Sequence, residues 1–183
     1  MSASRAERIA KVKKHFKTFP DWPKPGIMFR DMFPVFRSPE IVAEITSLFE
    51  EIVRETCSKV DVIVGLDARG FLFGPLLAQR LGTSFVPVRK RGKLPGPTIK
   101  ETYVLEYGED CFEMQEGSIL PGENALIIDD LIATGGTMNA ACSLVKKQQG
   151  NVVLCLVLIE LVDLKGRDKV PAKLLSLVEY EGE

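Results

Sequence analysis

The sequence predicts an α/β fold in which a mostly parallel, twisted sheet is flanked by helices. Two mainly apolar segments, at residues 61–64 and 125–128, each lead into a loop of small and charged residues and then into a helical pattern. A third run, 152–159, is apolar throughout, which is typical of a strand buried on both faces. Strands that alternate with helices favour a parallel sheet, and ligands bind such sheets beyond the carboxyl ends of the strands.

Length and composition favour one globular domain. The 183 residues are enough for one sizeable core but a tight fit for two, so we expect residues 1–183 to form a single domain. The formal net charge of -1 gives no general basic field, so we expect no nucleic-acid partner. The longest apolar run is far shorter than the roughly 20 residues that span a bilayer, and we expect no membrane partner.

The cysteine pattern predicts reduced thiols. The four cysteines are widely spaced and include no Cys-x-x-Cys pair, so neither a zinc site nor a disulfide scaffold is indicated. The first 17 residues lack the apolar core of a secretory signal. These observations predict a cytoplasmic protein.

The N-terminal third predicts two helices joined by an irregular segment. Residues 4–7 match a capping box at the start of an amphipathic helix. Prolines and a glycine within 19–31 predict an irregular connector, in which Arg30 and Asp31 could simply pair with each other. Residues 38–40 begin a second helix, which faces the core.

The segment 61–81 predicts a strand, a glycine-bounded loop and an apolar helix from residue 71. The glycine spacing resembles a P-loop, but Phe71 and Leu72 occupy the positions where a P-loop requires Lys and Ser or Thr. A nucleoside triphosphate site is therefore excluded. Arg69 offers a forked guanidinium at the end of a strand, although an ordinary salt bridge in the loop explains this segment equally well.

A basic segment follows the next predicted strand, 84–88. Residues 89–97 combine four cations with two glycines and two prolines, so we expect an exposed, mobile loop. Such a run is usually a solvated surface, but it could also close over a polyanion. The alternation in 102–107 predicts an edge strand or the arm of a lid.

Residues 125–137 carry the clearest chemical pattern. The small residues 134–137 lie at the start of a predicted helix, where backbone N–H groups and hydroxyls can surround a phosphate. Asp129 and Asp130 repel phosphate but can accept hydrogen bonds from ribose hydroxyls. We therefore expect this strand-to-helix loop, beginning at Asp129, to bind a ribose 5-phosphate. The helix that follows is expected to end at Gly150, before strands at 152–159 and 174–178.

Residues 125–137 resemble the phosphoribosyl diphosphate signature of the type I phosphoribosyltransferases. Further segments, in the same order along the chain, are similar to the branch of that family that uses adenine: 25–31, 65–71, 88–96, 105–108 and 160–167. The resemblance covers about residues 20–170. It implies the type I phosphoribosyltransferase fold, with a base-binding hood in residues 1–36 and a mobile lid in residues 90–112.

The resemblance also implies an activity, its cofactor and its partners. The 5-phosphoribosyl group of phosphoribosyl diphosphate would pass to adenine, giving AMP and diphosphate, a reaction of purine salvage. Magnesium would bind through the substrate and at Asp129 and Asp130, and the chain would form a homodimer. Two alternatives stay open: a different purine or a pyrimidine as the acceptor, and a regulator that senses phosphoribosyl diphosphate and contacts nucleic acid. The near-neutral charge and the lack of a recognisable DNA-binding element disfavour the regulator.

The resemblance implies three groups of binding residues and two further single residues. The ribose and 5-phosphate group comprises Asp129, Asp130, Ala133, Thr134, Gly135, Gly136 and Thr137. The diphosphate group comprises Asp67, Ala68, Arg69, Arg89, Lys90 and Lys93, with a cis peptide between Asp67 and Ala68 and some cations reaching a neighbouring subunit's site. The adenine group comprises Met28, Phe29, Arg30 and Leu161; Met28 replaces the smaller aliphatic residue usual in the family. Glu106 would accept the purine's proton, and Tyr107 would belong to the lid.

Overall fold

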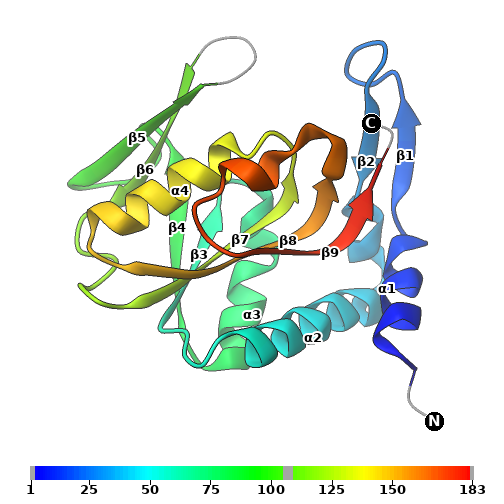
Figure 1. Cartoon of the computed structure of the whole chain (residues 1–183), viewed down its shortest axis with the longest axis horizontal. Coiled ribbons are helices and arrows are strands. Elements are labelled where there is room, and N and C mark those ends of the chain that lie inside the picture. The colour runs from blue at the N-terminus through cyan, green and yellow to red at the C-terminus, as the bar shows by residue number, and fades with distance from the viewer. Residues whose placement is uncertain (1–2, 105–108, 182–183) are drawn as a thin grey trace.

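The structure, a computed structural model, describes residues 3–104 and 109–181. It contains a seven-stranded sheet in the order β5-β6-β4-β3-β7-β8-β9 and a separate two-stranded sheet formed by β1 and β2 (Figure 1). Five neighbouring strands, β4, β3, β7, β8 and β9, pair in parallel, whereas β6 pairs antiparallel with both β4 and β5. The predicted α/β fold with a mostly parallel sheet is therefore confirmed.

The element bounds follow the predicted pattern for most of the chain. The parallel strands are β3 (Val62–Leu66), β4 (Ser84–Lys90), β7 (Asn124–Ile132), β8 (Asn151–Leu161) and β9 (Leu174–Tyr180). The helices are α1 (Arg5–Lys13), α2 (Pro39–Thr56), α3 (Gly74–Leu81) and α4 (Gly136–Lys147). Among the described residues, no helix is both long and apolar enough to cross a membrane.

Two hydrophobic cores cover the two faces of the sheet. Helices α1, α2 and α3 pack on one face with buried residues such as Phe49 and Phe73, and α4 packs on the other with residues such as Leu144. Neighbouring residues of β3 alternate between the cores, since Ile63 belongs to the first and Val64 to the second. Burial on both faces explains why these strands read as uninterrupted apolar runs.

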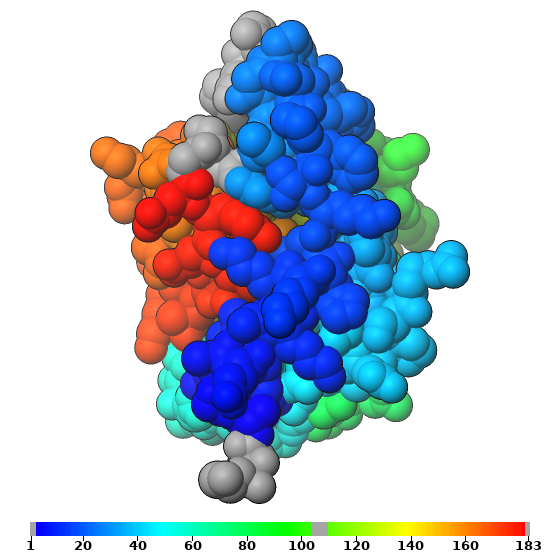
Figure 2. Space-filling model, turned by 90° about the vertical axis from the view of Figure 1, so that its right-hand side faces the viewer, coloured from blue at the N-terminus to red at the C-terminus, as the bar shows by residue number. Residues whose placement is uncertain are grey.

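The segment expected to be irregular forms an antiparallel hairpin. β1 (Lys17–Pro20) pairs with β2 (Met28–Asp31), and the prolines concentrate in the turn between them. Asp21 has a φ of 57°, and its Oδ1 accepts a hydrogen bond from the Gly26 N–H at 2.7 Å. The hairpin stands beside the C-terminal strand, as the neighbouring blue and red surfaces in Figure 2 show. The expectation of an irregular connector is wrong because prolines exclude a helix but are tolerated at the end of an exposed strand, as at Pro20, and in the turn of a hairpin.

Several predicted boundaries are also wrong. The helix expected from residue 71 begins only at Gly74, since Arg69–Leu72 forms a 3₁₀ turn first. α4 ends at Lys147, and Gln149 rather than Gly150 takes the left-handed conformation, with a φ of 62°. The strand β7 runs to Ile132, so the paired acids lie on the strand and not in the loop after it. Apolar content alone does not show where a strand's hydrogen bonds end.

Most of the basic segment 89–97 is exposed as predicted, but Arg89 and Lys90 lie on β4 rather than in a loop, and a buried carboxylate holds the turn that follows. Strand β6 (Glu109–Gln115), which the sequence did not predict, carries Glu113, which is only 2% exposed. The Glu113 Oε1 accepts hydrogen bonds from the backbone N–H groups of Lys93 and Leu94, at 2.9 and 3.0 Å. The turn after β4 is thus fastened to β6, which lies in the sheet between β4 and β5 (Thr98–Val104). β5 is an edge strand, as the alternation in 102–107 predicted, but it begins four residues earlier than expected.

Candidate active site

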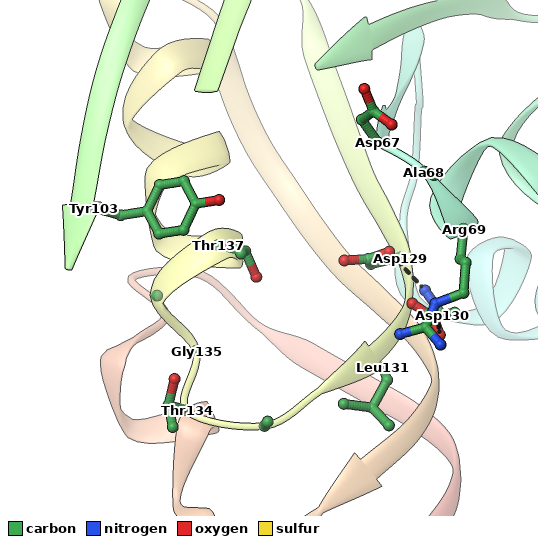
Figure 3. A pocket seen from close by; sticks show the side chains of 12 residues that line it. Asp67, Ala68, Arg69, Tyr103, Asp129, Asp130, Leu131, Thr134, Gly135 and Thr137 are labelled. Carbon is green, nitrogen blue, oxygen red and sulfur yellow. Dashed lines mark hydrogen bonds and ion pairs between the residues drawn. The ribbon is translucent and has the colours of Figure 1, made fainter. Parts of the chain in front are cut away.

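A cavity of about 490 Å³ opens where β3 and β7 end, at the edge of the sheet where a parallel α/β fold is expected to bind ligands (Figure 3). Its walls come from the loop after β3, from the end of β7 and the start of α4, and from β5. The lining residues are Asp67, Ala68, Arg69, Tyr103, Asp129, Asp130, Leu131, Ala133, Thr134, Gly135, Gly136 and Thr137. All seven residues expected to hold the ribose 5-phosphate therefore line one cavity.

The two acids on β7 have different surroundings because consecutive strand residues point to opposite sides. The Asp129 carboxylate points across the cavity toward Thr137 (Figure 3). Asp130 is 4% exposed, and its Oδ2 lies 2.9 Å from the Arg69 Nε. One acid is thus presented to a ligand while its neighbour holds Arg69 in the cavity wall.

Burial raises the pKa of both carboxyls. The pKa of Asp129 lies well above the ordinary aspartate value, chiefly because of desolvation and then because of the negative charge of Asp130. Desolvation also raises the pKa of Asp130, although the Arg69 guanidinium opposes that rise. Ligand groups that donate hydrogen bonds, such as sugar hydroxyls, would therefore stabilise the charged forms of both carboxylates.

The loop between β7 and α4 offers backbone donors to an anion. Gly135, with a φ of 80°, is the N-cap residue of α4, and no side chain caps the helix. The first N–H groups of a helix have no partner within it, and the helix dipole favours negative charge at that end. Figure 3 shows the Thr137 side chain at the same end of the cavity. A phosphate bound there would be held by backbone groups and hydroxyls.

The residues expected to hold the diphosphate are only partly brought together. Asp67, Ala68 and Arg69 line the cavity, and the predicted cis peptide between Asp67 and Ala68 is present. The Arg89 Nε donates to the Asp67 Oδ2 at 3.0 Å, which places Arg89 beside that wall. The Lys90 Nζ lies 3.2 Å from Asp110, and Lys93 belongs to the exposed turn.

Two of the four residues expected to bind adenine, Arg30 and Leu161, meet at Tyr180, at the end of β9. The Arg30 guanidinium lies over the Tyr180 ring, 4.2 Å from its centroid, and its Nη1 donates to the Thr18 hydroxyl at 2.9 Å. Leu161, the last residue of β8, is paired with Tyr180 in the sheet register. Tyr180 therefore connects the hairpin to the end of the central sheet, a connection that the sequence analysis missed.

On the other face of β2, where Phe29 and Asp31 point, the hairpin forms an open aromatic pocket of about 330 Å³. It is lined by Phe19, Trp22, Phe29 and Asp31. The rings of Trp22 and Phe29 meet edge to face, with centroids 4.3 Å apart. Met28 precedes Phe29 on β2, at the register position opposite Pro20. Such a pocket suits a flat heterocycle.

Two predicted residues, Glu106 and Tyr107, lie outside the residues that the structure describes. Two residues of the cavity wall, Tyr103 and Leu131, were missed as site residues. The Tyr103 hydroxyl lies 3.2 Å from an Asp110 carboxylate oxygen, and burial together with that charge raises the pKa of Tyr103. The alternation of Tyr103 with Leu105 and Tyr107 was the available signal, since residues two apart share one face of a strand.

The cavity suits a magnesium ion that arrives with a phosphorylated substrate. Within residues 3–104 and 109–181, no three His, Cys, Asp or Glu residues are grouped so that they could hold a metal ion. The cavity nevertheless presents Asp129 and Asp130 close to residues 133–137, which we call the phosphate loop after the group we propose that it binds. Magnesium typically combines one or two carboxylates with water and substrate phosphate oxygens, and this donor set fits that mode.

Comparisons with known proteins agree with this geometry. A family model described as "Phosphoribosyl transferase domain" matches residues 35–179. The adenine phosphoribosyltransferase of Caenorhabditis elegans is 49% identical over 183 residues, covering 99% of both chains. The human adenine phosphoribosyltransferase is 48% identical over 172 residues, covering 93% of this chain and 96% of the human one.

A solved structure extends the similarity to three dimensions. The adenine phosphoribosyltransferase of Saccharomyces cerevisiae, complexed with D-2,5-dideoxy-2,5-imino-altritol 1,6-bisphosphate and adenine, superposes with a TM-score of 0.93. It is 44% identical, and the match covers 94% of this chain and 99% of the yeast chain. The two chains therefore share the whole fold.

Proposed function

The chain belongs to the adenine phosphoribosyltransferase family, and from that premise we propose that the cavity at the ends of β3 and β7 is its phosphoribosyl diphosphate site. The protein transfers the 5-phosphoribosyl group of phosphoribosyl diphosphate to adenine, giving AMP and diphosphate in purine salvage. What remains to be assigned is which residues perform this reaction.

One observation carries the assignment: a single cavity joins an uncapped helix start to a pair of adjacent carboxyls, of which Asp130 is buried and Asp129 is partly exposed. Residues 133–137 would bind the 5-phosphate through backbone N–H groups and hydroxyls, because anions favour that end of α4. Asp129 and Asp130 would accept hydrogen bonds from the ribose hydroxyls, and their raised pKa values favour an environment rich in donors. Both acids position the sugar and take no proton in the reaction.

The diphosphate would bind along the wall formed by Asp67, Ala68 and Arg69. Its charge grows as it leaves C1 of the ribose, and Arg69 and Arg89 would offset that charge in the transition state. Lys90 and Lys93 extend the same basic surface, in this subunit or toward the neighbour in the proposed homodimer. Magnesium would bind the substrate's phosphate oxygens together with Asp129 and Asp130, where it supplies additional positive charge.

Adenine would bind between the hairpin and the end of β8. Phe29 and Leu161 would contact its faces, and the backbones of Met28 and Arg30 would read its edge. As N9 forms a bond to C1, the C1–O bond to diphosphate breaks, and Glu106 would accept the proton that leaves N9. Tyr107 and the rest of residues 90–112 would form the lid, and residues 1–36 the hood.

We also propose that the protein works in the cytoplasm. The four cysteines are free thiols in the structure, which suits the reducing cytoplasm.

The test is a panel of free bases assayed with phosphoribosyl diphosphate and magnesium. We expect kcat/KM for adenine to exceed that for hypoxanthine, guanine and uracil by at least about 100-fold, since buried polar groups that lose their partners discriminate by roughly that factor or more. A preference for another base would contradict the assigned specificity. Dependence of turnover on magnesium, measured after chelation and re-addition, tests the cofactor separately.

A further inference from the structure

The phosphate loop packs directly against a second loop with no side chain between them. A Cβ on Gly166 would lie 2.2 Å from the Ala133 carbonyl oxygen and 2.8 Å from the Gly135 nitrogen. A Cβ on Gly135 would lie 2.2 Å from the Gly166 carbonyl oxygen. Because real Cβ atoms do not approach other atoms this closely, each loop fixes the backbone position of the other.

An ion pair between the buried Glu160 carboxylate and the exposed Arg167 guanidinium holds this second loop in place. Glu160, near the end of β8, is 4% exposed and receives the forked guanidinium of Arg167, with Nε to Oε1 at 3.0 Å and Nη2 to Oε2 at 2.5 Å. The Ser176 hydroxyl also donates to the Glu160 Oε2, at 2.9 Å, and the Arg167 Nη1 donates to the Leu174 carbonyl at 2.7 Å. A bidentate pair fixes orientation as well as distance, so residue 167 is fastened to both β8 and β9.

The same segment begins at the residue proposed to contact adenine. Leu161 follows Glu160 directly, and the chain then passes through the 3₁₀ turns Val162–Leu164 and Gly166–Lys169. The Lys165 φ of 50° turns the backbone between them. The segment 160–169, which we call the clasp, therefore runs from the base side of the site to the phosphate loop.

We propose that the clasp sets the distance between the phosphate loop and Leu161, so that Gly166 and Arg167 are positioning residues for phosphoribosyl transfer. The inference rests on the proposed placement of the two substrates. Catalysis that depends on positioning is sensitive to displacements of about 1 Å, which can lower the rate by up to about 100-fold. Neither residue lines the cavity, so they act through the loops that they hold.

The first test is Gly166→Ala, with Gly150→Ala as its matched control. At both positions an added Cβ meets atoms closer than 3.0 Å, but at Gly150 these belong to Ile119 and Val145, away from the cavity. Gly166→Ala should raise the KM for phosphoribosyl diphosphate about tenfold and the KM for adenine less than threefold. Gly150→Ala should lower the melting temperature and leave both KM values unchanged.

A second pair of variants covers the case in which Gly166→Ala does not fold. Arg167→Ala should raise the KM for phosphoribosyl diphosphate about fivefold or more, and Arg167→Lys should restore it only in part, because lysine lacks the fork. The control is Arg80→Ala, whose side chain is similarly exposed and pairs with Glu50 far from the site. A purely structural role for Arg167 would give both alanine variants the same profile, with lower melting temperatures and wild-type KM values.

Binding of ribose 5-phosphate, measured by calorimetry, separates this inference from the proposed function. If the wild-type protein transfers phosphoribosyl groups and the Gly166 and Arg167 variants keep wild-type KM values and wild-type affinity, the clasp proposal is wrong and the function stands. If the wild-type protein shows no transfer to adenine but the variants bind ribose 5-phosphate more weakly, the function is wrong and the clasp stands. Absence of ribose 5-phosphate binding by the wild-type protein would overturn both.

Discussion

The two halves of the proposed site, one for phosphate and one for the base, are built in different ways. The phosphate half lies at the ends of strands β3 and β7, where every residue of β3 is buried, and residues 129–137 supply much of it in one continuous stretch. The base half combines β2, the end of β8 and the end of β9. Its hairpin is far less buried, with β1 exposed along its whole length. The first half is fixed by the main core, and the second by a few contacts between distant segments.

This difference predicts that substitutions separate by substrate. Changes in the phosphate half should alter the use of phosphoribosyl diphosphate, whereas changes in the hairpin should alter the use of adenine. The clasp is the exception, since it touches the phosphate loop and carries Leu161.

The largest effect is expected for the double variant Asp129→Asn, Asp130→Asn. Amides are weaker acceptors of hydrogen bonds from ribose hydroxyls, and an amide at position 130 loses the ion pair with Arg69. We therefore expect kcat/KM for phosphoribosyl diphosphate to fall about 1000-fold, equivalent to about 4 kcal/mol. Steady-state kinetics with phosphoribosyl diphosphate varied at saturating adenine measures this. The control, Asp61→Asn, changes a carboxylate just before β3, at the opposite end of that strand from the cavity. Wild-type kinetic constants in the double variant would show that neither acid contributes to the use of phosphoribosyl diphosphate.

The second largest effect is expected for Glu106→Gln, which keeps the size of the side chain but cannot accept a proton. Loss of a general base typically lowers turnover about 100-fold, and we expect that loss in kcat with little change in the KM for phosphoribosyl diphosphate. Circular dichroism should show an unaltered fold. Glu101→Gln, which changes a β5 acid paired with Lys147, serves as the control. Undiminished turnover would mean that solvent or another group takes the proton.

A smaller effect is expected for Phe29→Ala in the hairpin. Loss of a ring stacked on a base weakens binding by about 1–3 kcal/mol, so the KM for adenine should rise about tenfold while the KM for phosphoribosyl diphosphate stays constant. Phe33→Ala is the matched control, because Phe33 is 52% exposed and lies beyond the aromatic pocket. Equal shifts in both KM values would show that the two halves of the site are not independent.

The smallest effect concerns stability, in the single variant Asp129→Asn. The folded-state pKa of Asp129 is raised above its unfolded value, so the folded protein binds more protons between the two pKa values and loses stability as the pH rises through that window. At pH 7 the neutral amide escapes this penalty, and the melting temperature should rise by about 2–4 °C per kcal/mol gained.

Thermal unfolding of both proteins across the pH range tests the sign of this effect. Below the ordinary aspartate pKa of about 3.9, Asp129 is neutral in the folded and unfolded states, and the gain from the amide substitution should disappear. A gain that persists there would mean that the ionisation of Asp129 does not cause it. The wild-type activity should fall with decreasing pH already above that ordinary value, since protonated Asp129 is a weaker acceptor.

Sequence reasoning succeeded where one short stretch carries the whole signal. The capping box at Ser4 and Glu7 is present, as is the proline start of α2. The seven residues predicted to bind the ribose 5-phosphate, all within 129–137, line one cavity. These features depend on neighbours along the chain, on strand burial and on the dipole of one helix, all of which composition and spacing reveal.

The structure was needed wherever two distant segments meet. β6 was not recognised, although it carries the Glu113 carboxylate that holds the basic turn. Proline obscured the hairpin, and Tyr103 entered the cavity wall only because β5 reaches α4.

By itself, then, the sequence determined the parallel sheet and the position of the acid pair and of the small-residue loop 133–137 in one cavity, because local patterns of burial and backbone conformation encode them. The tertiary structure alone decided that Tyr180 joins Arg30 to Leu161 and that Gly166 fits against Gly135. These contacts join residues that are far apart along the chain, and their geometry is set by how the sheet brings strand ends together. No local pattern records such a distance.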